Sequence, residues 1–412
     1  MPVTLTAPRV LTGTSDLGPG WVRLDGGLVT GVGSGRPPGA VDVVLTTGVL
    51  APGLLDAQVN GAFGVDFAGA DDVARAGVLD ALPTSGVTAV VPTVITAPVA
   101  ELVTDLRRLR AAAAALAARP GAARLLPAHV EGPFLAERRR GAHPRELLRD
   151  PAPDVVDALL EAGADGVLGY VTLAPERAGA IEAIGRFVRA GVQVAVGHSD
   201  ADEATVHAAA DAGATLVTHL YNAQRPMHHR DPGVVGAALV DDRLTCGLIV
   251  DGYHVLPAAV RVAFTCKPGR IMLVTDAMAA LGMPEGTYAL GGQRVVVREG
   301  EPPRLDDGTL AGAAGRLDDA IGLAVAAGVP LQLAVEAATR VPADAMRHYR
   351  LGRLVPGGPA DLVWLAPDGD RPLRARATWV GGVLAHDGGL PTATPSSPKP
   401  DPAPDPIMED VR

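Results

Sequence analysis

The sequence contains very little cysteine: only Cys246 and Cys266 occur among 412 residues. Two cysteines are too few for a disulfide framework, and they fit a protein that works in a reducing compartment such as the cytosol. We expect both to be core residues.

Long basic runs and leader-like segments are also absent. The longest Lys/Arg run is Arg138–Arg140, and 46 acidic residues against 36 basic ones give a net charge of -10, which argues against a nucleic-acid surface. Residues 1–16 have neither the basic nor the apolar region of a signal peptide, so we expect a cytoplasmic protein. The longest uncharged stretch, residues 320–335, is interrupted by Gly-Val-Pro and predicts two helices rather than a membrane span.

The two chain ends differ from the middle in their pattern of apolar and polar residues. A length of 412 residues with 48% hydrophobic residues allows one large domain and a smaller one. Residues 1–50 and 351–388 alternate apolar and polar positions between turn residues, which predicts a small β-sandwich assembled from both ends. The large domain is expected over residues 51–350. Residues 389–412, rich in Pro, Ser and Asp, predict a disordered tail.

The middle of the chain repeats an apolar run, a polar residue that closes it, and a helical pattern. The closing residues are, in order, Asp56, Thr93, Glu131, Thr172, His198, His219, Asp251 and Asp276. Eight such units predict an α/β fold, a TIM-like (β/α)8 barrel with its site on the C-terminal face. A doubly wound open sheet is the alternative, but no Gly-rich phosphate turn follows the first strand. A strand-rich insertion is expected at residues 286–309, before the helices of residues 316–346.

Two of these closing residues are histidines that follow consecutive strands. His198 and His219 flank a helical pattern, and strands joined by such a crossover end at the same edge of their sheet. Glu131 closes an earlier strand, just before Gly-Pro, and is the candidate third ligand. One carboxylate and two imidazoles suit zinc, and three protein ligands leave a position for water, as in catalytic sites. For a lone histidine an ordinary polar cap would be the better interpretation; three strand ends in register favour a metal.

Several motifs together resemble the amidohydrolase superfamily and, within it, the N-acetylglucosamine-6-phosphate deacetylase family. The resemblance extends from about Leu50 to Leu365 and depends on the pieces PGLLD at residues 52–56, QVNG at 58–61, HVEGP at 129–133, VTLAPE at 171–176, GHS at 197–199, THLYNA at 218–223, DGYH at 251–254 and LVTDA at 273–277. It implies hydrolysis of the acetamide of N-acetyl-D-glucosamine 6-phosphate to glucosamine 6-phosphate and acetate, in amino-sugar catabolism or recycling.

The metal site departs from the usual superfamily pattern at one point. Members commonly have His-x-His after the first strand, and here these positions are Gln58 and Asn60, which are poor zinc ligands. This matches the single-metal branch of the family, so we expect one divalent ion per subunit, zinc or alternatively iron, manganese or cobalt. Such an ion lowers the pKa of its bound water to about 7. Asp276, at the end of the eighth strand, is placed to take that proton and deliver it to the leaving amine.

The resemblance also implies the substrate contacts. His143 and His254 are expected to hold the sugar or polarise its carbonyl, while His129 is expected beside the ligands rather than among them. Phosphate contacts are implied at Asn222 and Ala223, and at Arg230, which in the family reaches the neighbouring subunit's site, so we expect a homodimer. The alternative for Arg230 is a surface pair with Asp231. The remaining implied contacts are Ala142, Asp251, Leu310, Ala311 and Gly312.

Two other functions are weighed against this one. A dihydroorotase-like or hydantoinase-like enzyme would share the barrel, but these enzymes usually need a modified lysine, and Lys267 and Lys399, the only lysines, lie at no barrel strand end. A catalytically silent sugar-phosphate sensor would keep the pocket without turnover. Metal analysis and a deacetylation assay distinguish these possibilities.

Overall fold

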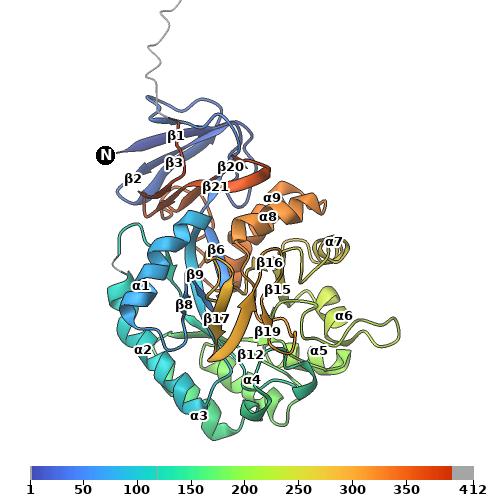
Figure 1. Cartoon of the computed structure of the whole chain (residues 1–412). Coiled ribbons are helices and arrows are strands. Elements are labelled where there is room, and N and C mark those ends of the chain that lie inside the picture. The colour runs from blue at the N-terminus through green and yellow to red at the C-terminus, as the bar shows by residue number, and fades with distance from the viewer. Residues whose placement is uncertain (1, 118, 392–412) are drawn as a thin grey trace, which may run out of the picture.

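The computed structural model describes residues 2–117 and 119–391, and in them eight parallel strands form a barrel surrounded by helices (Figure 1). The barrel strands are β6 (Leu54–Val59), β9 (Val87–Ile95), β11 (Ala128–Glu131), β12 (Leu168–Leu173), β13 (Gln193–Val196), β14 (Leu216–Val217), β15 (Thr245–Ile249) and β16 (Ile271–Val274). Nearly every residue in them is buried, because helices cover the outside and side chains fill the interior. The predicted barrel fold is confirmed.

The barrel closes beside the polar strand ends. Each strand from β9 to β16 pairs with its neighbours, with β6 next to β9. The last strand meets the first where the backbone N–H of Asp276 donates to Gln58 O at 2.9 Å and Val59 bridges to Ala277. Closure therefore brings the polar residues after β6 against those after β16.

The helices form the outer layer, and α1 and α5 begin at side-chain caps. Asp71 accepts a hydrogen bond from Ala74 N at the start of α1, and Asp202 accepts one from Thr205 N at the start of α5. The α-helices are α1 (Asp72–Ala81), α2 (Val99–Ala117), α3 (Pro153–Ala162), α4 (Ala180–Arg189), α5 (Glu203–Asp211), α6 (Gly233–Val240), α7 (Pro257–Cys266), α8 (Leu317–Ala326), α9 (Leu331–Ala337) and α10 (Arg340–Ala345). Short 3-10 turns occur at η1 (Leu82–Ser85), η2 (Glu137–Arg139) and η3 (Arg145–Leu147).

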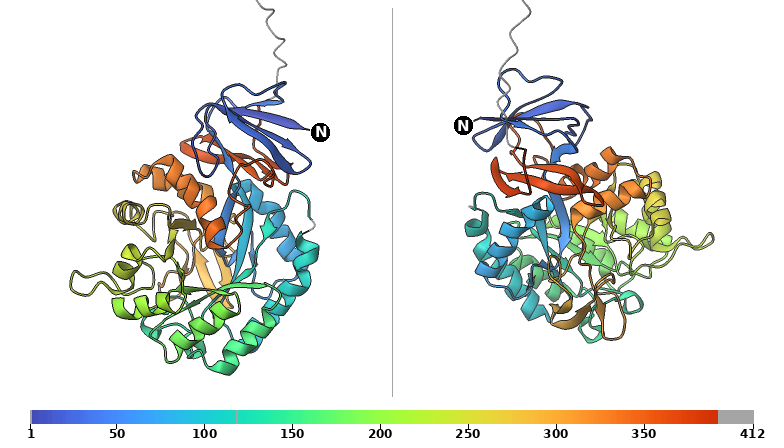
Figure 2. Two further views of the ribbon diagram at one scale, coloured as in Figure 1. Left: turned by 180° about the vertical axis from the view of Figure 1, so that it is seen from behind. Right: turned by 45° about the horizontal axis from the view of Figure 1, so that its top comes forward.

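Two four-stranded sheets built from both chain ends pack beside the barrel (Figure 2). One has the order β3-β2-β1-β4 and the other the order β22-β21-β20-β5. Leu5 and Val22 of the first share a buried apolar cluster with Trp364 and Trp379 of the second. Their strands are β1 (Val3–Ala7), β2 (Gly20–Asp25), β3 (Leu28–Ser34), β4 (Val43–Val44), β5 (Val49–Pro52), β20 (Leu362–Asp368), β21 (Arg371–Val380) and β22 (Val383–Asp387).

Smaller elements complete the chain. They are β10 (Arg124–Leu125), the pair β7 (Gly61–Ala62) and β8 (Val65–Asp66), and the three-stranded sheet of β17 (Gly286–Leu290), β18 (Gln293–Val297) and β19 (Arg304–Leu305). None of the described helices has both the length and the hydrophobicity needed to cross a membrane. The expectation of two core cysteines was wrong for Cys266, which is exposed at the end of α7. The tail expected at residues 389–412 lies, from residue 392 on, outside the described residues.

Candidate active site

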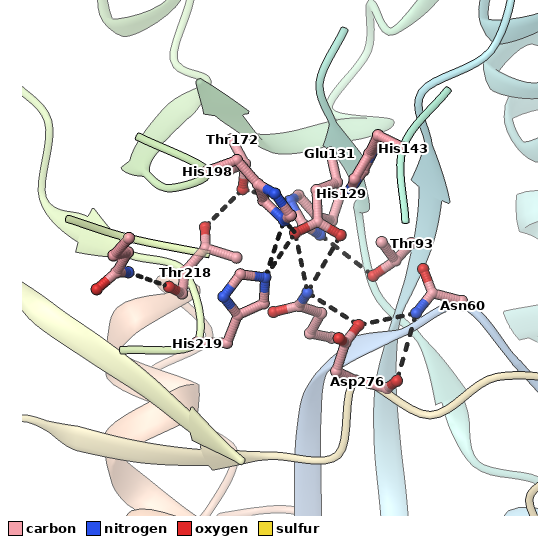
Figure 3. Close-up of polar contacts among 12 residues, drawn as sticks. Asn60, Thr93, His129, Glu131, His143, Thr172, His198, Thr218, His219 and Asp276 are labelled. Atoms are coloured by element: carbon pink, nitrogen blue, oxygen red, sulfur yellow. Dashed lines mark hydrogen bonds and ion pairs between the residues drawn. The ribbon is translucent and has the colours of Figure 1, made fainter. Parts of the chain in front are cut away.

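Four strand ends place their polar side chains around one point at the C-terminal rim (Figure 3). Glu131 is the last residue of β11, while His198, His219 and Asp276 each stand two residues after β13, β14 and β16. All four are at least nine-tenths buried. Because the strands are parallel and in register, residues far apart in the sequence meet here.

Three ligand atoms form a nearly equilateral triangle. His198 Nε2 lies 3.1 Å from His219 Nε2 and 3.2 Å from Glu131 Oε1, and His219 Nε2 lies 3.1 Å from Glu131 Oε1. Atoms held about 2.0–2.2 Å from one tetrahedral ion are about 3.3–3.6 Å apart, so the triangle is close to the size that such an ion requires. A second set, Glu131, His143 and His198, offers ligand atoms within 4.8 Å of one another.

The surrounding hydrogen bonds decide which nitrogens carry protons. His198 Nδ1 lies 2.8 Å from Arg139 O, and because a carbonyl can only accept, that nitrogen is the donor. Nε2 of His198 therefore faces His219 and Glu131. Nδ1 of His219 is buried and has no partner among the described residues. A carboxylate oxygen and two imidazole nitrogens that converge on one point are the arrangement that a cation satisfies.

The pKa values of Glu131 and His219 are shifted by their contacts within the triangle. Burial raises the pKa of Glu131, but hydrogen bonds from His198 and His219 outweigh it and hold the pKa well below its usual range. Burial lowers the pKa of His219, yet the bond to Glu131 and its charge produce a net rise. The carboxylate is therefore ionised and the site attracts positive charge.

Asp276 is held by two side-chain amides, one from Gln58 in β6 and one from Asn60 directly after it. Asn60 Nδ2 donates to Asp276 Oδ1 at 2.8 Å, and Gln58 Nε2 donates to the same oxygen at 3.1 Å. Burial, followed by the negative charge of Glu131, raises the pKa of Asp276 to about 6. A carboxyl with a pKa near neutrality can both accept and return a proton.

The backbone of the rim is strained. Positive φ angles, which residues other than glycine rarely adopt, occur at His198 (47°), His219 (28°), Tyr221 (79°), Ala223 (49°) and Asp276 (51°). Each such residue costs on the order of 1–3 kcal/mol and persists where its surroundings hold it. All of these residues except Tyr221 line the cavity above the cluster.

His143 stands at the edge of the cluster. Its ring packs edge-on against His198 with centroids 4.5 Å apart, and its Nδ1 lies 2.8 Å from Thr96 Oγ1. Burial lowers the pKa of His143 to about 3, so the ring is neutral. The single hydroxyl proton of Thr96 is directed to Glu131 O at 3.2 Å, which leaves His143 Nδ1 as a donor and Nε2 as an acceptor.

His129 has no nitrogen left for a metal. Its Nδ1 lies 3.2 Å from Thr93 Oγ1 and its Nε2 lies 2.7 Å from Thr172 Oγ1, while the ring stacks on Tyr170 at 3.8 Å. Burial lowers its pKa to about 3. His129 therefore supports the strand ends beside the cluster rather than facing it.

A cavity of about 320 Å³ opens over the four residues. Among the substrate contacts predicted from the sequence, those that line it are Ala142, His143, Asn222, Ala223, His254, Leu310 and Gly312. Asn222 Nδ2 is a buried donor without a partner among the described residues, so it is available to a ligand. Burial raises the pKa of Asp251, but the bond from His254 Nδ1 at 2.7 Å, the charge of His254 and the backbone N–H groups of Tyr253 and His254 together lower it.

Three predicted contacts do not line this cavity. Asp251 reaches it only through His254, and Ala311 is fully buried behind its neighbours. Arg230 is exposed on the loop after β14, where its guanidinium lies 2.9 Å from His229 Nε2. The surface pair with Asp231 is absent, because that carboxylate pairs with Arg225 instead.

The sequence did not indicate two arginines that line the cavity or two amide side chains that hold Asp276. Arg138 and Arg139 line the cavity, and both pair with Asp200 at 3.1 and 2.7 Å. Their run was interpreted only as charge composition, although its position shortly after Glu131 puts it in a loop at the rim. Gln58 and Asn60 were recognised as absent ligands, but their role as donors to Asp276 is visible only in the folded barrel.

Known proteins resemble this chain over most of its length. The amidohydrolase family matches residues 49–385. The N-acetylglucosamine-6-phosphate deacetylase of Bos taurus is 38% identical over 348 residues, which are 82% of this chain and 83% of that protein. The N-acetylgalactosamine-6-phosphate deacetylase of Escherichia coli O157:H7 is 38% identical over 343 residues, which are 82% of this chain and 88% of that protein.

The fold has a solved counterpart. The structure of an aspartate-to-alanine mutant of the Mycobacterium smegmatis N-acetyl-D-glucosamine-6-phosphate deacetylase, in complex with N-acetyl-D-glucosamine-6-phosphate, matches with a TM-score of 0.86 at 38% identity. The match covers 93% of this chain and 99% of that chain.

Proposed function

This chain belongs to the amidohydrolase family and, within it, to the N-acetylglucosamine-6-phosphate deacetylases, and on that premise we propose how its site hydrolyses an amide. The reaction is cleavage of the acetamide of N-acetyl-D-glucosamine 6-phosphate to glucosamine 6-phosphate and acetate. The observation that carries the mechanism is the triangle of Glu131, His198 and His219 with Asp276 beside it.

Glu131, His198 and His219 hold one divalent ion per subunit in this proposal. The support is the fit described above: an oxygen and two nitrogens at 3.1–3.2 Å, with His198 Nδ1 already engaged as a donor. Two nitrogens and one oxygen suit zinc best. We prefer this set to the one with His143, because His143 is not required to complete the tight triangle and borders the cavity instead.

The ion supplies Lewis-acid chemistry when it is bound, lowering the pKa of water and polarising the amide carbonyl. We expect no second ion beside β6, because Gln58 and Asn60 replace imidazole ligands and direct their amide nitrogens toward Asp276. These two amides act as donors that fix one oxygen of Asp276. The other oxygen stays available for proton transfer.

Asp276 is the general base and then the general acid. It accepts the proton of the attacking water, and it later gives this proton to the amine nitrogen as the C–N bond breaks. A poor leaving group such as an amine needs that proton, so one carboxyl serves both steps. The raised pKa of about 6 suits a group that must be reprotonated in every cycle.

The remaining lining residues hold the sugar phosphate. His143 accepts a hydrogen bond through Nε2 in the tautomer set by Thr96, which suits a sugar hydroxyl. Asn222 and Ala223 contribute donors beyond His219, and His254, oriented by Asp251, contributes a ring-nitrogen contact to the sugar. Arg230, exposed outside the cavity of its own subunit, completes the phosphate site of a partner in a homodimer.

A matched pair of substrates tests the proposal. Purified enzyme should contain one equivalent of metal per chain, release acetate from N-acetylglucosamine 6-phosphate, lose activity to a chelator and regain it on reloading. N-acetylgalactosamine 6-phosphate is the second candidate, because a deacetylase named for it is equally similar. Acetate release from only the second substrate would identify the galactosamine epimer as the substrate. Release from neither would contradict the proposed function.

A further inference from the structure

The loop from Thr218 to Gln224 has an unusual backbone for its composition. His219, Tyr221 and Ala223 have φ angles of 28°, 79° and 49°, and none of them is glycine. A backbone of this kind persists only where surrounding contacts over-determine it. The loop carries a metal ligand of the proposed site and the donors assigned to the substrate, so whatever holds it also holds the site.

The side chain of Gln224 closes this loop across His219. Its Nε2 donates to Thr218 O at 2.7 Å, and its Oε1 accepts from Tyr221 N at 3.1 Å. The residue is 3% exposed and does not line the cavity. It therefore replaces the regular backbone bonds that the left-handed turns prevent, without touching the reacting atoms.

The same corner connects the two histidine loops. Ser199 N donates to Ala223 O at 3.2 Å, and Arg225 N donates to Ser199 O at 2.9 Å, on either side of Gln224. Ser199 directly follows His198 in the chain. A shift of the Gln224 turn would thus move both imidazoles relative to each other.

We propose that Gln224 is a positioning residue, which sets the separation of His198 and His219 by holding the loop between Thr218 and Tyr221. The proposal rests on the metal-dependent function above and adds a residue that acts through the loop that carries His219. Partners that orient metal ligands in this way typically change metal affinity 10- to 100-fold when they are removed. A purely structural role would change stability alone.

The chain offers a matched control for a structural role. Gln193, at the start of β13 and so at the opposite end of the barrel, is 7% exposed and donates through Nε2 to Ala345 O at 2.8 Å. Gln193→Met and Gln224→Met each remove one buried amide donor and keep a side chain of similar length. Gln193→Met loses its hydrogen bond where the barrel strands begin, and Gln224→Met loses its hydrogen bond where they end.

The experiment measures zinc affinity of the metal-free proteins, by competition with a chromophoric chelator, together with thermal unfolding and steady-state kinetics. We expect both variants to unfold at lower temperature, but only Gln224→Met to bind zinc about tenfold or more weakly and to lose kcat at nearly unchanged KM. Gln224→Glu keeps the acceptor for Tyr221 N and puts an oxygen against Thr218 O, so it should weaken zinc binding as well.

Two outcomes would overturn the proposal. One is parental zinc affinity and kcat in a folded Gln224→Met or Gln224→Glu protein. The other is that neither variant folds while Gln193→Met does, which would assign Gln224 a structural role. Absence of zinc binding and acetate release in the parent enzyme would instead refute the proposed function, so the two failures are distinguishable.

Discussion

The two ends of the barrel differ in what their cavities are made of. The larger cavity, about 920 Å³, lies on the side where the strands begin and is lined by β10, the loop after α10 and the edges of the small sheets, including Leu28, Arg124, Arg347 and Val383. The smaller one, about 320 Å³, lies where the strands end. Volume alone would select the wrong end.

The arginines that line the cavity at the first end already have partners. Arg124 pairs with Asp361 at 2.9 Å, and the guanidinium groups of Arg347 and Arg350 donate to the backbone oxygens of Gly191 and Gly357. At the other end, two imidazole nitrogens and a carboxylate oxygen converge at 3.1–3.2 Å, and Asn222 Nδ2 has no partner among the described residues. Unsatisfied buried groups and perturbed pKa values, rather than space, mark the site.

The largest expected effect comes from removing one buried carboxylate at each end. Glu131→Gln should abolish stable metal binding and lower turnover by about three orders of magnitude or more, because the only anionic ligand is lost. Asp361→Asn, which breaks the pair with Arg124, should lower stability and leave metal content intact. Metal analysis of both purified proteins tests this, and an equal loss of metal would remove the distinction between the two ends.

The second effect separates proton transfer from metal binding at the C-terminal rim. Asp276→Asn should retain the metal and lower kcat by about 10²- to 10⁴-fold, since it removes the proton carrier but none of the three proposed ligands. Single-turnover acetate release with metal-loaded protein measures the chemical step. Turnover near that of the parent would show that another residue is the general base.

The third effect concerns Arg230, which we propose to complete the phosphate site of a second subunit. Arg230→Ala should lower kcat/KM for the phosphorylated sugar about 10- to 100-fold and hardly change it for N-acetylglucosamine, because a guanidinium contributes charge-assisted bonds only to the phosphate. A uniform loss on both substrates would argue against a phosphate contact. Mixing Arg230→Ala chains with Asp276→Asn chains should restore activity in mixed dimers if the arginine acts in trans; proven subunit exchange without recovery would contradict this.

The sequence predicted one end of the barrel far better than the other. The parallel strands are short apolar runs that end on polar residues, so Glu131, His198, His219 and Asp276 could be placed together from strand order alone. Cavities at the strand beginnings are formed by backbone, arginine stems and sheet edges that carry no motif. Nothing in the sequence pattern indicated that Leu28 and Val383 would border the same cavity.

Within the rim, what the sequence could not predict depends on backbone conformation. The left-handed φ angles at His219, Tyr221 and Ala223 have no signature, since none of these residues is glycine. The contacts of Gln224 and the donors to Asp276 follow from that geometry and from barrel closure. The confirmed fold therefore supplied positions, while the roles of these side chains required the three-dimensional contacts.

The smallest expected effect is at the large cavity, and it tests whether that end is inert. Arg347 borders it, is exposed, and has one side-chain bond, to Gly191 O at 3.2 Å. Arg347→Met keeps the stem and removes the charge, so kcat and KM should stay within about twofold and stability should change by about 0.5 kcal/mol or less, as for most surface substitutions. Kinetics and thermal unfolding beside the parent enzyme measure both. A large change in KM with normal folding would mean that a charge at the strand beginnings influences substrate binding at the strand ends. Such coupling would have to pass through the barrel interior, where Leu55, Tyr170 and Ile249 belong to one packed cluster. Because close-packed apolar side chains fill that interior, we expect no coupling between the two ends.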